Sequence, residues 1–314
     1  MTKPAHLLGV DIGGTNLRVA LANLKGEIIA RATKTTTNVR DPKTVVHNIC
    51  ECVHELLQST NVPLEQVGAV GAGAPGLTNA ETGVVIATSY LMGWRDVPLK
   101  AMLEDTLGIP ASVENDVNLA ALGESCFGAG RGFPEFVFLA IGTGVGAGII
   151  LKGELFQGSA WTAGEIGYML VPGVSEDPAA LGKPGGLEAM VGGEGLRGEW
   201  QSRWSSGKTQ LPRDLMATQI FDAAVAGDDL ANNLLDRTAR TLAYGICNMT
   251  LIVNAPLFVL GGSVGLHTAL RDRTQAVVDR HARRLRPQLV LSTLGSDAQL
   301  MGGIRLAEIA LRGH

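Results

Sequence analysis

The sequence predicts an α/β fold made of two related halves. It opens with three apolar strands, and strand and helix patterns alternate after them. A Gly/Thr turn between two strands occurs near residue 13 and again near residue 143, which indicates an internal repeat. The 314 residues are 46% hydrophobic and 18% charged, so the chain can bury large cores.

The first half is predicted as three strands, a helix, a strand, a helix and a strand. "HLLGV", "NLRVALANL" and "EIIARATKTT" form a meander, with glycines in the first hairpin. Apolar residues recur at helical spacing over residues 41–59, and a second helix covers 99–107. A buried strand ends at "GAPG", and the strand "IPASVEND" follows the second helix. We expect Asn115 and Asp116 at the C-terminal end of that last strand.

The second half repeats the opening pattern. After a helix from residue 117, "FVFLAIGTGVGAGIILKGELFQG" reads as strand, Gly/Thr turn, strand, turn and short strand. The strands "PLFVLGG" and "PQLVLSTL" follow later, and "GGIRLAEIALRG" forms the last helix. Residues 174–186 are predicted as a loop, and further helices are predicted near 214–225, 230–248 and 269–284.

Composition excludes several classes of protein. The formal net charge of −4 gives no electrostatic basis for binding nucleic acid or an anionic membrane. No apolar run approaches the roughly 20 residues that span a bilayer, and "MTKPAHLLGVDIGG" lacks the features of a signal peptide. The four cysteines, at positions 50, 52, 126 and 247, are too scattered for a disulfide framework. We therefore expect a cytoplasmic protein.

The first glycine turn carries chemistry that a hairpin alone does not need. A Gly-Gly hairpin is common, so one such turn is weak evidence for a site. Here Asp11 at the strand end could hold hydrated Mg²⁺, and backbone N–H groups beside Gly13, Gly14 and Thr15 could approach phosphate oxygens. "IGTGVGAG" and "LGGSVG" add two more glycine clusters after strands. The pattern GxxxxGK[ST] is absent, and "GTGVGAG" is followed by a strand instead of a helix, so neither a P-loop nor a dinucleotide site is predicted.

Seven motifs together resemble one family. "DIGGTNLR", "GAPG", "ENDVNLAALGE", "IGTGVGAGI", "AGEIGY", "GGLEAMVGGEGL" and "LGGSVG" occur in the order seen in the ROK family of repressors, open reading frames and sugar kinases. The chain resembles its glucokinase-type members. The resemblance implies two ribonuclease H-like lobes of the actin/hexokinase ATPase type, with sugar and ATP bound in a cleft between them. It also implies transfer of the γ-phosphoryl group to a hexose hydroxyl, with glucose O6 as first candidate.

The resemblance also implies an arrangement of lobes. A small lobe is expected from residues 1–117 plus 303–314, and a large lobe from 118–302, with the nucleotide, the sugar-binding glutamates and the oligomer contacts on the large lobe. A homodimer or homotetramer is expected, in a pathway of carbohydrate metabolism such as glycolysis.

Each role falls on a matching residue. Asp116 matches the catalytic base that accepts the hydroxyl proton, although by local sequence alone it could equally cap a helix. Asn115 is expected to hydrogen-bond the sugar, Glu165 and Glu188 to accept its hydroxyls, and Gly76 to bring backbone against it. The nucleotide contacts implied are Asp11 (through Mg²⁺ and water), Gly13, Gly14, Thr15, Gly142, Thr143, Gly144, Gly261 and Gly262.

The sequence departs from the family pattern at the zinc site and at two sugar contacts. Related kinases carry a His after "GEIG" and a cysteine-rich loop that bind zinc, whereas here Tyr168 and "DPAALGKPGGLEAM" stand there, so no zinc is predicted. Tyr168 is kept as a sugar contact. Tyr90 stands where related kinases have a sugar-binding Asn. Mannose, fructose or an N-acetylhexosamine therefore stay open beside glucose, as does polyphosphate beside ATP·Mg²⁺.

A DNA-binding regulator is disfavoured on sequence. The repressor branch of the family carries a winged helix before its first phosphate motif, whereas this sequence reaches Asp11 almost at once. The other alternative is a ROK sugar sensor without catalysis, which is expected to have lost Asp116 or the first glycine turn. Both are present, so a sugar kinase is the predicted function.

Overall fold

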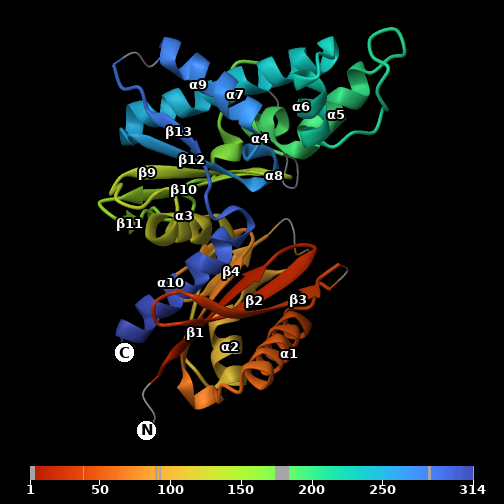
Figure 1. Cartoon of the computed structure of the whole chain (residues 1–314). Helices are drawn as coiled ribbons and strands as arrows, with labels where there is room; N and C mark the ends of the chain where they lie inside the picture. Colours follow the sequence, from red (N-terminus) through yellow and green to blue (C-terminus); the bar gives the residue numbers. More distant parts are fainter. Residues whose placement is uncertain are drawn as a thin grey trace. The chain divides into compact units, whose positions relative to one another are not determined.

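The computed structural model describes residues 4–37, 39–88, 91, 93–173, 184–281 and 284–313. The chain forms two compact α/β units (Figure 1). The first unit contains Met1–Arg131, Gln157–Ala163 and Ser296–His314, and the second contains Gly132–Phe156 and Gly164–Gly295. No helix among the described residues is long and apolar enough to cross a bilayer.

The first unit is built on a five-stranded sheet of order β3-β2-β1-β4-β8. β1 pairs antiparallel with β2, and β2 with β3, whereas β1, β4 and β8 are parallel neighbours. Because parallel strands end at one edge of a sheet, Asp11, Gly73 and Glu114 lie side by side in register. The strands are β1 (His6–Ile12), β2 (Asn16–Asn23), β3 (Ile28–Thr35), β4 (Val67–Ala74) and β8 (Ala111–Asn115).

Helices cover both faces of this sheet. α1 (Pro42–Thr60) begins at the N-cap Asp41, whose carboxylate accepts the N–H of Thr44 at 2.9 Å, and it buries one apolar face. α1 and α2 (Leu99–Leu107) pack in the same hydrophobic cluster as β1, β2 and β4. α10 (Ala298–Gly313) forms a smaller cluster with other residues of these strands.

α10 lies very close to its neighbours because glycine lines the contact. A Cβ on Gly302 would lie 1.8 Å from the carbonyl oxygen of Leu119 in α3 (Asp116–Phe127), and one on Gly71 in β4 would lie 2.0 Å from that of Gly303. The sequence alone places the lobe boundaries at residues 117 and 303. In the structure α3 and the start of α10 fold with the first unit, because these backbones pack directly against each other.

Three short strands of the first unit were not predicted. β5 (Leu77–Asn79), β6 (Val84–Ala87) and β7 (Arg95–Val97) form a separate antiparallel sheet after β4. Segments of three or four residues are too short to show an alternating pattern. A 3₁₀ turn, η1 (Leu64–Gln66), precedes β4.

The second unit repeats the first sheet. Its strand order is β11-β10-β9-β12-β13, again with an antiparallel meander followed by two parallel strands. In both units the strands therefore run third, second, first, fourth, fifth, and the predicted repeat is confirmed. The strands are β9 (Phe136–Ile141), β10 (Val145–Leu151), β11 (Glu154–Leu155), β12 (Leu257–Gly261) and β13 (Gln288–Leu291).

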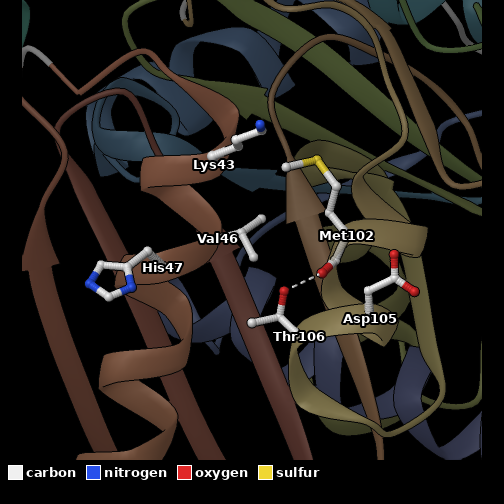
Figure 2. A pocket seen from close by; sticks show the side chains of 6 residues that line it. All are labelled: Lys43, Val46, His47, Met102, Asp105 and Thr106. Atoms are coloured by element: carbon white, nitrogen blue, oxygen red, sulfur yellow. Dashed lines mark hydrogen bonds between the residues drawn. The ribbon is translucent and has the colours of Figure 1, made fainter.

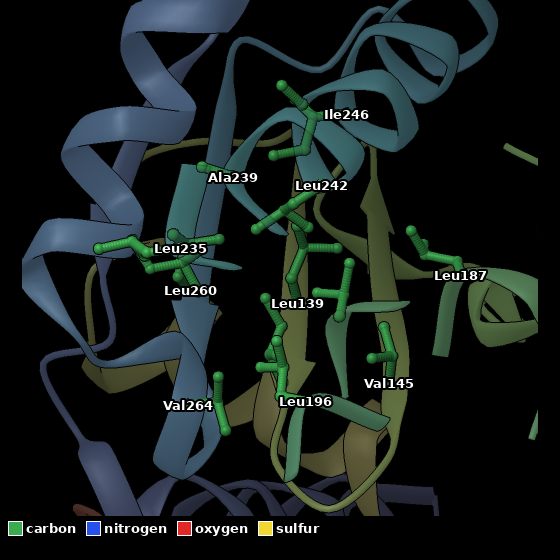
Figure 3. Packing of buried hydrophobic residues seen from close by; sticks show 14 of the residues in the cluster. Leu139, Val145, Leu187, Leu196, Leu235, Ala239, Leu242, Ile246, Leu260 and Val264 are labelled. Atoms are coloured by element: carbon green, nitrogen blue, oxygen red, sulfur yellow. The ribbon is translucent and has the colours of Figure 1, made fainter. Parts of the chain in front are cut away.

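Large apolar side chains fill the core of the second unit. Leu139 and Leu260 of the sheet pack in one cluster with Leu235 and Leu242 of α7 and with Leu196 of α5 (Figure 3). α4 and α5 were not predicted, and α4 begins at Gly186, inside the predicted loop; residues 174–183 of that loop lie outside the described residues. The helices are α4 (Gly186–Val191), α5 (Gly193–Arg203), α6 (Ala217–Val225), α7 (Asp229–Val253), α8 (Gly262–Gly265) and α9 (Thr268–His281), with the 3₁₀ turns η2 (Ile166–Tyr168) and η3 (Gly295–Asp297).

Candidate active site

Asn115 and Asp116 lie at the junction of β8 and α3. Asn115 ends the strand and caps the helix, because its Oδ1 accepts the N–H groups of Val117 at 2.9 Å and Asn118 at 3.1 Å. Asp116 is the first residue of α3, and its Oδ1 accepts the N–H of Val117 at 2.9 Å. The capping role that local sequence allowed for Asp116 thus belongs to Asn115. The half-buried carboxylate of Asp116 lies at the partially positive end of α3.

Asn115 also joins the ends of two parallel strands. Its Nδ2 donates to the carbonyl oxygen of Gly76 at 2.9 Å, just beyond β4. Gly76 has φ +96°, and a Cβ there would lie 2.3 Å from the carbonyl oxygen of Ala87, so only glycine fits. The structure therefore brings three predicted sugar-site residues together: Gly76, Asn115 and Asp116. Asn115 uses its amide for three internal hydrogen bonds, and its contact with a sugar stays a prediction.

Asp11 is buried and faces Arg18, its direct partner in the β1–β2 register. Nε and Nη2 of Arg18 donate to Asp11 Oδ2 at 2.9 and 2.6 Å, and Nη1 donates to the carbonyl oxygen of Ser296. Burial raises the pKa of Asp11, and the charge and hydrogen bonds of Arg18 oppose that rise. Sequence reasoning missed Arg18, because its pairing with Asp11 depends on the strand register.

The turn beside Asp11 is partly occupied by its own hydrogen bonds. The N–H of Gly13 donates to the carbonyl oxygen of Asn16 at 2.9 Å, and the Gly13 carbonyl accepts the hydroxyl of Thr36 at 2.7 Å. One of the predicted phosphate donors therefore closes the hairpin instead. Gly14 and Thr15 are exposed, and their approach to phosphate stays a prediction.

A magnesium ion would fit Asp11 only with help from a nucleotide. Among the described residues, no three His, Cys, Asp or Glu side chains come together as a metal site. Mg²⁺ in phosphoryl-transfer sites is commonly held by one or two carboxylates plus phosphates and water, so the single carboxylate of Asp11 suits an ion that arrives with phosphate. The zinc prediction concerns Tyr168 and a loop whose residues 177–183 lie outside the described part.

The predicted nucleotide residues of the second unit converge around the β9–β10 turn. Gly142 closes that turn by donating its N–H to the carbonyl oxygen of Gly144 at 3.0 Å. The carbonyl of Gly142 accepts the N–H of Gly193 at 2.8 Å, at the start of α5. Thr143 is exposed at the tip. Gly193 lies in the motif "GGLEAMVGGEGL", but the motif alone indicates no role for it. Its contact with Gly142 shows that it belongs with the β9–β10 turn.

The glycine pair after β12 belongs to the same group. Gly261 ends β12 and is buried, and Gly262 follows with φ +79°. A Cβ on Gly262 would lie 2.4 Å from the carbonyl oxygen of Ile141, immediately before the β9–β10 turn. The structure thus places this pair close to the β9–β10 turn, and its contact with a nucleotide stays a prediction.

Glu165 and Glu188 are neighbours in the second unit. Glu188, in α4, is half-buried, and its Oε2 accepts the N–H of Val145 at 2.8 Å. Partial burial raises the pKa of Glu165, and the negative charge of Glu188 raises it further. Glu165 retains exposed surface, where water weakens this repulsion. Glu188 is held by Val145, and Glu165 lies close enough to feel its charge, so neither glutamate is an isolated loop charge.

Two other predicted positions have different outcomes. Tyr168 ends η2, three residues after Glu165, and is 58% exposed, so its ring is available to a ligand. Tyr90 lies outside the described residues. The predicted residues therefore form one set in each unit: Asp11, Gly13–Thr15, Gly76 and Asn115–Asp116 in the first, and Gly142–Gly144, Glu165, Tyr168, Glu188 and Gly261–Gly262 in the second.

A hollow lies elsewhere on the first unit. It has a volume of about 270 Å³ and lies between α1 and α2, where Thr106 donates its hydroxyl to the carbonyl oxygen of Met102 at 2.7 Å (Figure 2). No predicted site residue lines it, and most of its side chains are exposed. The hollow is a surface groove between two helices, lined by Lys43, Val46, His47, Met102, Asp105 and Thr106.

The duplicated sheet and its glycine turns define an actin/hexokinase-type ATPase fold. Comparison with known proteins assigns the chain within that class: the model of the ROK family matches residues 7–309. The chain belongs to the ROK family.

Individual relatives agree with this assignment. A glucokinase from Halalkalibacterium halodurans is 32% identical over 307 residues, which cover 94% of this chain and 93% of the relative. The solved ROK hexokinase from Thermus thermophilus is 26% identical with a TM-score of 0.83, covering 98% of this chain and 100% of that one. A ROK glucokinase from Streptomyces griseus in complex with glucose and AMPPNP is 27% identical with a TM-score of 0.76, covering 97% and 99%.

Proposed function

We propose that this ROK-family protein is an ATP-dependent sugar kinase that transfers the γ-phosphoryl group to a hexose hydroxyl, with O6 of glucose as the first candidate. One observation carries the proposal: the carboxylate of Asp116 stands at the β8–α3 junction, and the Asn115 cap holds that junction in place. The likeness to glucokinases over nearly the whole chain supports it.

In this proposal Asp116 is the general base. It accepts the proton of the sugar hydroxyl as that oxygen attacks the γ-phosphorus. A bond forms between the sugar oxygen and the γ-phosphorus, the bond to the β–γ bridging oxygen breaks, and ADP leaves. The remaining work is positioning and charge neutralisation, because this reaction needs no covalent intermediate with the protein.

Glu165 and Glu188 are proposed to bind sugar hydroxyls. A neutral polyol presents only O–H donors to a carboxylate, and hydrogen bonds to an ionised acceptor are stronger than neutral ones. Partial burial raises the pKa of Glu165, and the charge of Glu188 raises it further, because the two carboxylates repel each other. Hydroxyl donors between them would offset that repulsion without adding charge. The glucose in the Streptomyces griseus relative supports a hexose as the ligand.

The nucleotide is proposed to lie against the glycine turns. In the second unit the exposed Thr143 and the Gly261–Gly262 pair surround one turn, and in the first unit Gly14 and Thr15 are exposed beside Asp11. A Mg²⁺ ion carried by the nucleotide would neutralise phosphate charge when bound, and Asp11 would hold it through water. AMPPNP in the Streptomyces griseus relative supports ATP over polyphosphate as donor.

Two alternatives follow from particular residues. Tyr168 stands at a position where related kinases have a His, and its exposed ring offers a different donor pattern, which favours testing other hexoses and N-acetylhexosamines. A sensor without catalysis would bind sugar but would not need Asp116. A cytoplasmic location, a homodimer or homotetramer and a role in glycolysis remain proposals that rest on the likeness to glucokinases.

A panel of sugars tests the proposal. Glucose, mannose, fructose, N-acetylglucosamine and N-acetylmannosamine are each supplied with MgATP, and ADP release is measured. We expect the highest kcat/KM with glucose. Asp116→Asn should lower kcat by about 10²- to 10⁴-fold, because a positioned base contributes about that much, while calorimetry still detects sugar binding. The matched control is Asp105→Asn, an exposed carboxylate on α2. Saturable sugar binding without ADP release from the wild type would identify a sensor.

A further inference from the structure

Glu114 is a buried carboxylate directly before the catalytic junction. It is 2% exposed, and it precedes Asn115 and Asp116 in the chain. Burial raises the pKa of Glu114, and its three hydrogen bonds oppose that rise; no cation of the described part of the chain contributes. A buried charge without a cation is costly, so its presence beside Asp116 calls for a physical reason.

All three partners of Glu114 are donors. Oε1 accepts the backbone N–H of Asn115 at 2.7 Å and the Nδ2 of Asn118 at 3.0 Å. Oε2 accepts from Nε2 of Gln157. Glu114 accepts at both oxygens, as an ionised carboxylate does, whereas an amide or a protonated acid could occupy the site only if Gln157 turned its own amide oxygen toward it. This site is therefore built for a carboxylate.

Two of these bonds act on the junction itself. Asn115 is the cap of α3, and Asn118, also buried, donates its backbone N–H to the Oδ1 of Asn115. Glu114 thus holds the Asn115 cap in two ways: it accepts the backbone N–H of Asn115, and it accepts the side-chain amide of Asn118, whose backbone N–H donates to that cap. Asp116 lies between these two anchored residues, so its direction depends on Glu114.

The third bond reaches a distant segment. Gln157 begins the loop 157–163, which folds with the first unit although the chain on both sides belongs to the second. The N–H of Ala163 donates to the carbonyl oxygen of Gln157 at 3.2 Å and closes the loop. Gly164 follows, and its carbonyl accepts the N–H of Ala147 at 2.8 Å, immediately before Glu165. Gln157 therefore anchors the start of the loop that leads to a proposed sugar ligand.

We propose that Glu114 and Gln157 form a positioning pair for phosphoryl transfer. The pair fixes the junction that carries Asp116 and holds the loop 157–163 to that junction within the first unit, so that the base keeps its direction. This inference rests on the proposed kinase function. Glu114 and Gln157 act through other residues and touch neither sugar nor nucleotide.

Exchanging the two side chains tests the pair. In Glu114→Gln the amide of Gln157 must turn over to present its oxygen to the new donor, whereas in Gln157→Glu two carboxylates face each other. In the double variant the amide of residue 114 donates to the carboxylate of residue 157, and its oxygen still accepts from Asn115 and Asn118. All three hydrogen bonds and the net charge are then restored. Steady-state kinetics with glucose and with ATP, and the melting temperature, are measured for all four proteins.

We expect Gln157→Glu to lower kcat/KM for glucose by about 10- to 100-fold, as expected for a buried polar group left facing the wrong partner, and Glu114→Gln to lower it less, because the amide of Gln157 can turn over. KM for ATP should stay near the wild-type value, because the glycine turns do not contact the pair. The double variant should recover to within about 3-fold of wild type. Glu154→Gln and Gln58→Glu are the matched exposed controls and should not change the kinetics.

Two outcomes would overturn the inference. A double variant no more active than the weaker single variant would show that the two residues are not coupled. Single variants that only melt earlier, with kcat and both KM values unchanged per folded molecule, would show a purely structural role. If Glu114→Gln does not fold, the half-buried partner is changed instead. Gln157→Leu must then show the loss in kcat/KM for glucose that is expected for Gln157→Glu. A wild type inactive on every sugar would instead refute the kinase proposal itself.

Discussion

The two units share one sheet topology but carry their charges in different places. The first hairpins of the two sheets can be compared at the second residue pair from the turn. At that position the first unit has Asp11 opposite Arg18, and the second unit has Ala140 opposite Gly146. The turns themselves are closed in a similar way, by the N–H of Gly13 and by that of Gly142. An ion pair is therefore not needed to form this hairpin.

This difference separates what the fold requires from what the site requires. Burying a carboxylate is costly even beside a guanidinium, and the second unit forms the same hairpin without one. The second unit instead places its carboxylates outside the sheet, on Glu165 before η2 and Glu188 in α4. The first unit thus offers acidic groups at the ends of its strands, and the second offers backbone turns and two glutamates beside them.

Of the tests of this contrast, replacing Asp11 has the largest expected effect. Asp11→Ala makes the first hairpin resemble the second, and we expect kcat/KM for ATP to fall by about 100-fold, as when one preorganised charge interaction at a reacting phosphate is lost. The protein should still fold, because Arg18 is one-quarter exposed and can turn toward water. Initial rates over a range of MgATP concentrations measure the effect.

The control for this variant is Asp105→Ala, an exposed carboxylate in the same unit. It should leave kcat/KM for ATP unchanged. If Asp11→Ala also stays within about 3-fold of wild type, Asp11 has only a structural role, and the contrast between the two hairpins carries no functional meaning.

The strands and turns of both sheets could be predicted because their signals are local. "GVDIGGTNLR" shows apolar strand, glycine turn and strand within ten residues, and "IGTGVGAG" repeats it. Arg18 could not be assigned as the partner of Asp11 without the strand register. Likewise, Asn115 and Asp116 are both good caps, and the choice depends on β8, which pairs with β4 as far as Asn115.

Other features depended on contacts distant in the sequence. α4 and the start of α5 lie in "GGLEAMVGGEGL", whose glycines have poor helix propensity. The N–H of Gly193 is held by the carbonyl of Gly142, far away in the chain. The bond between Glu114 and Gln157 joins residues 43 positions apart. No local pattern shows such a pair, although the motif "ENDVN" does identify the junction that it supports.

The units also differ in how their helices pack, and this difference predicts an intermediate effect on stability. α10 contacts α3 through Gly302, where a Cβ would lie 1.8 Å from a backbone oxygen. Within α7, a Cβ on Gly245 would meet only side chains, at 3.4 Å or more. Gly302→Ala should therefore lower the free energy of unfolding by about 1–3 kcal/mol. Gly245→Ala should raise it by about 0.5–1 kcal/mol, because alanine loses less entropy in a helix.

Urea unfolding followed by circular dichroism measures both variants. The pair controls itself, since each is a Gly→Ala change inside a helix. Equal effects of the two substitutions, with Gly302→Ala destabilising no more than Gly245→Ala, would mean that the backbone contact at Gly302 relaxes freely. That result would remove the distinction between glycine packing in the first unit and side-chain packing in the second.

The smallest expected effect concerns the two glutamates of the second unit. The pKa of Glu165 is raised by partial burial and then by the charge of Glu188. A protonated Glu165 offers fewer acceptors to sugar hydroxyls, so kcat/KM for the sugar should fall as pH drops through that raised pKa. Glu188→Gln removes the negative neighbour and lowers the pKa of Glu165, which moves the acid limb of the profile to lower pH.

The pH profile separates this electrostatic effect from the loss of a ligand. Glu188→Gln will also reduce activity at every pH, because Glu188 is itself a proposed sugar contact, but a uniform loss does not move the midpoint of the acid limb. The same substitution at Glu194, an exposed residue in the first turn of α5, should leave the midpoint in place. An acid limb that stays fixed in Glu188→Gln would mean that another group controls it. The remaining predicted site carboxylates, Asp11 and Asp116, belong to the first unit. The pH dependence of sugar use would then come from these strand-end acids and not from the glutamates.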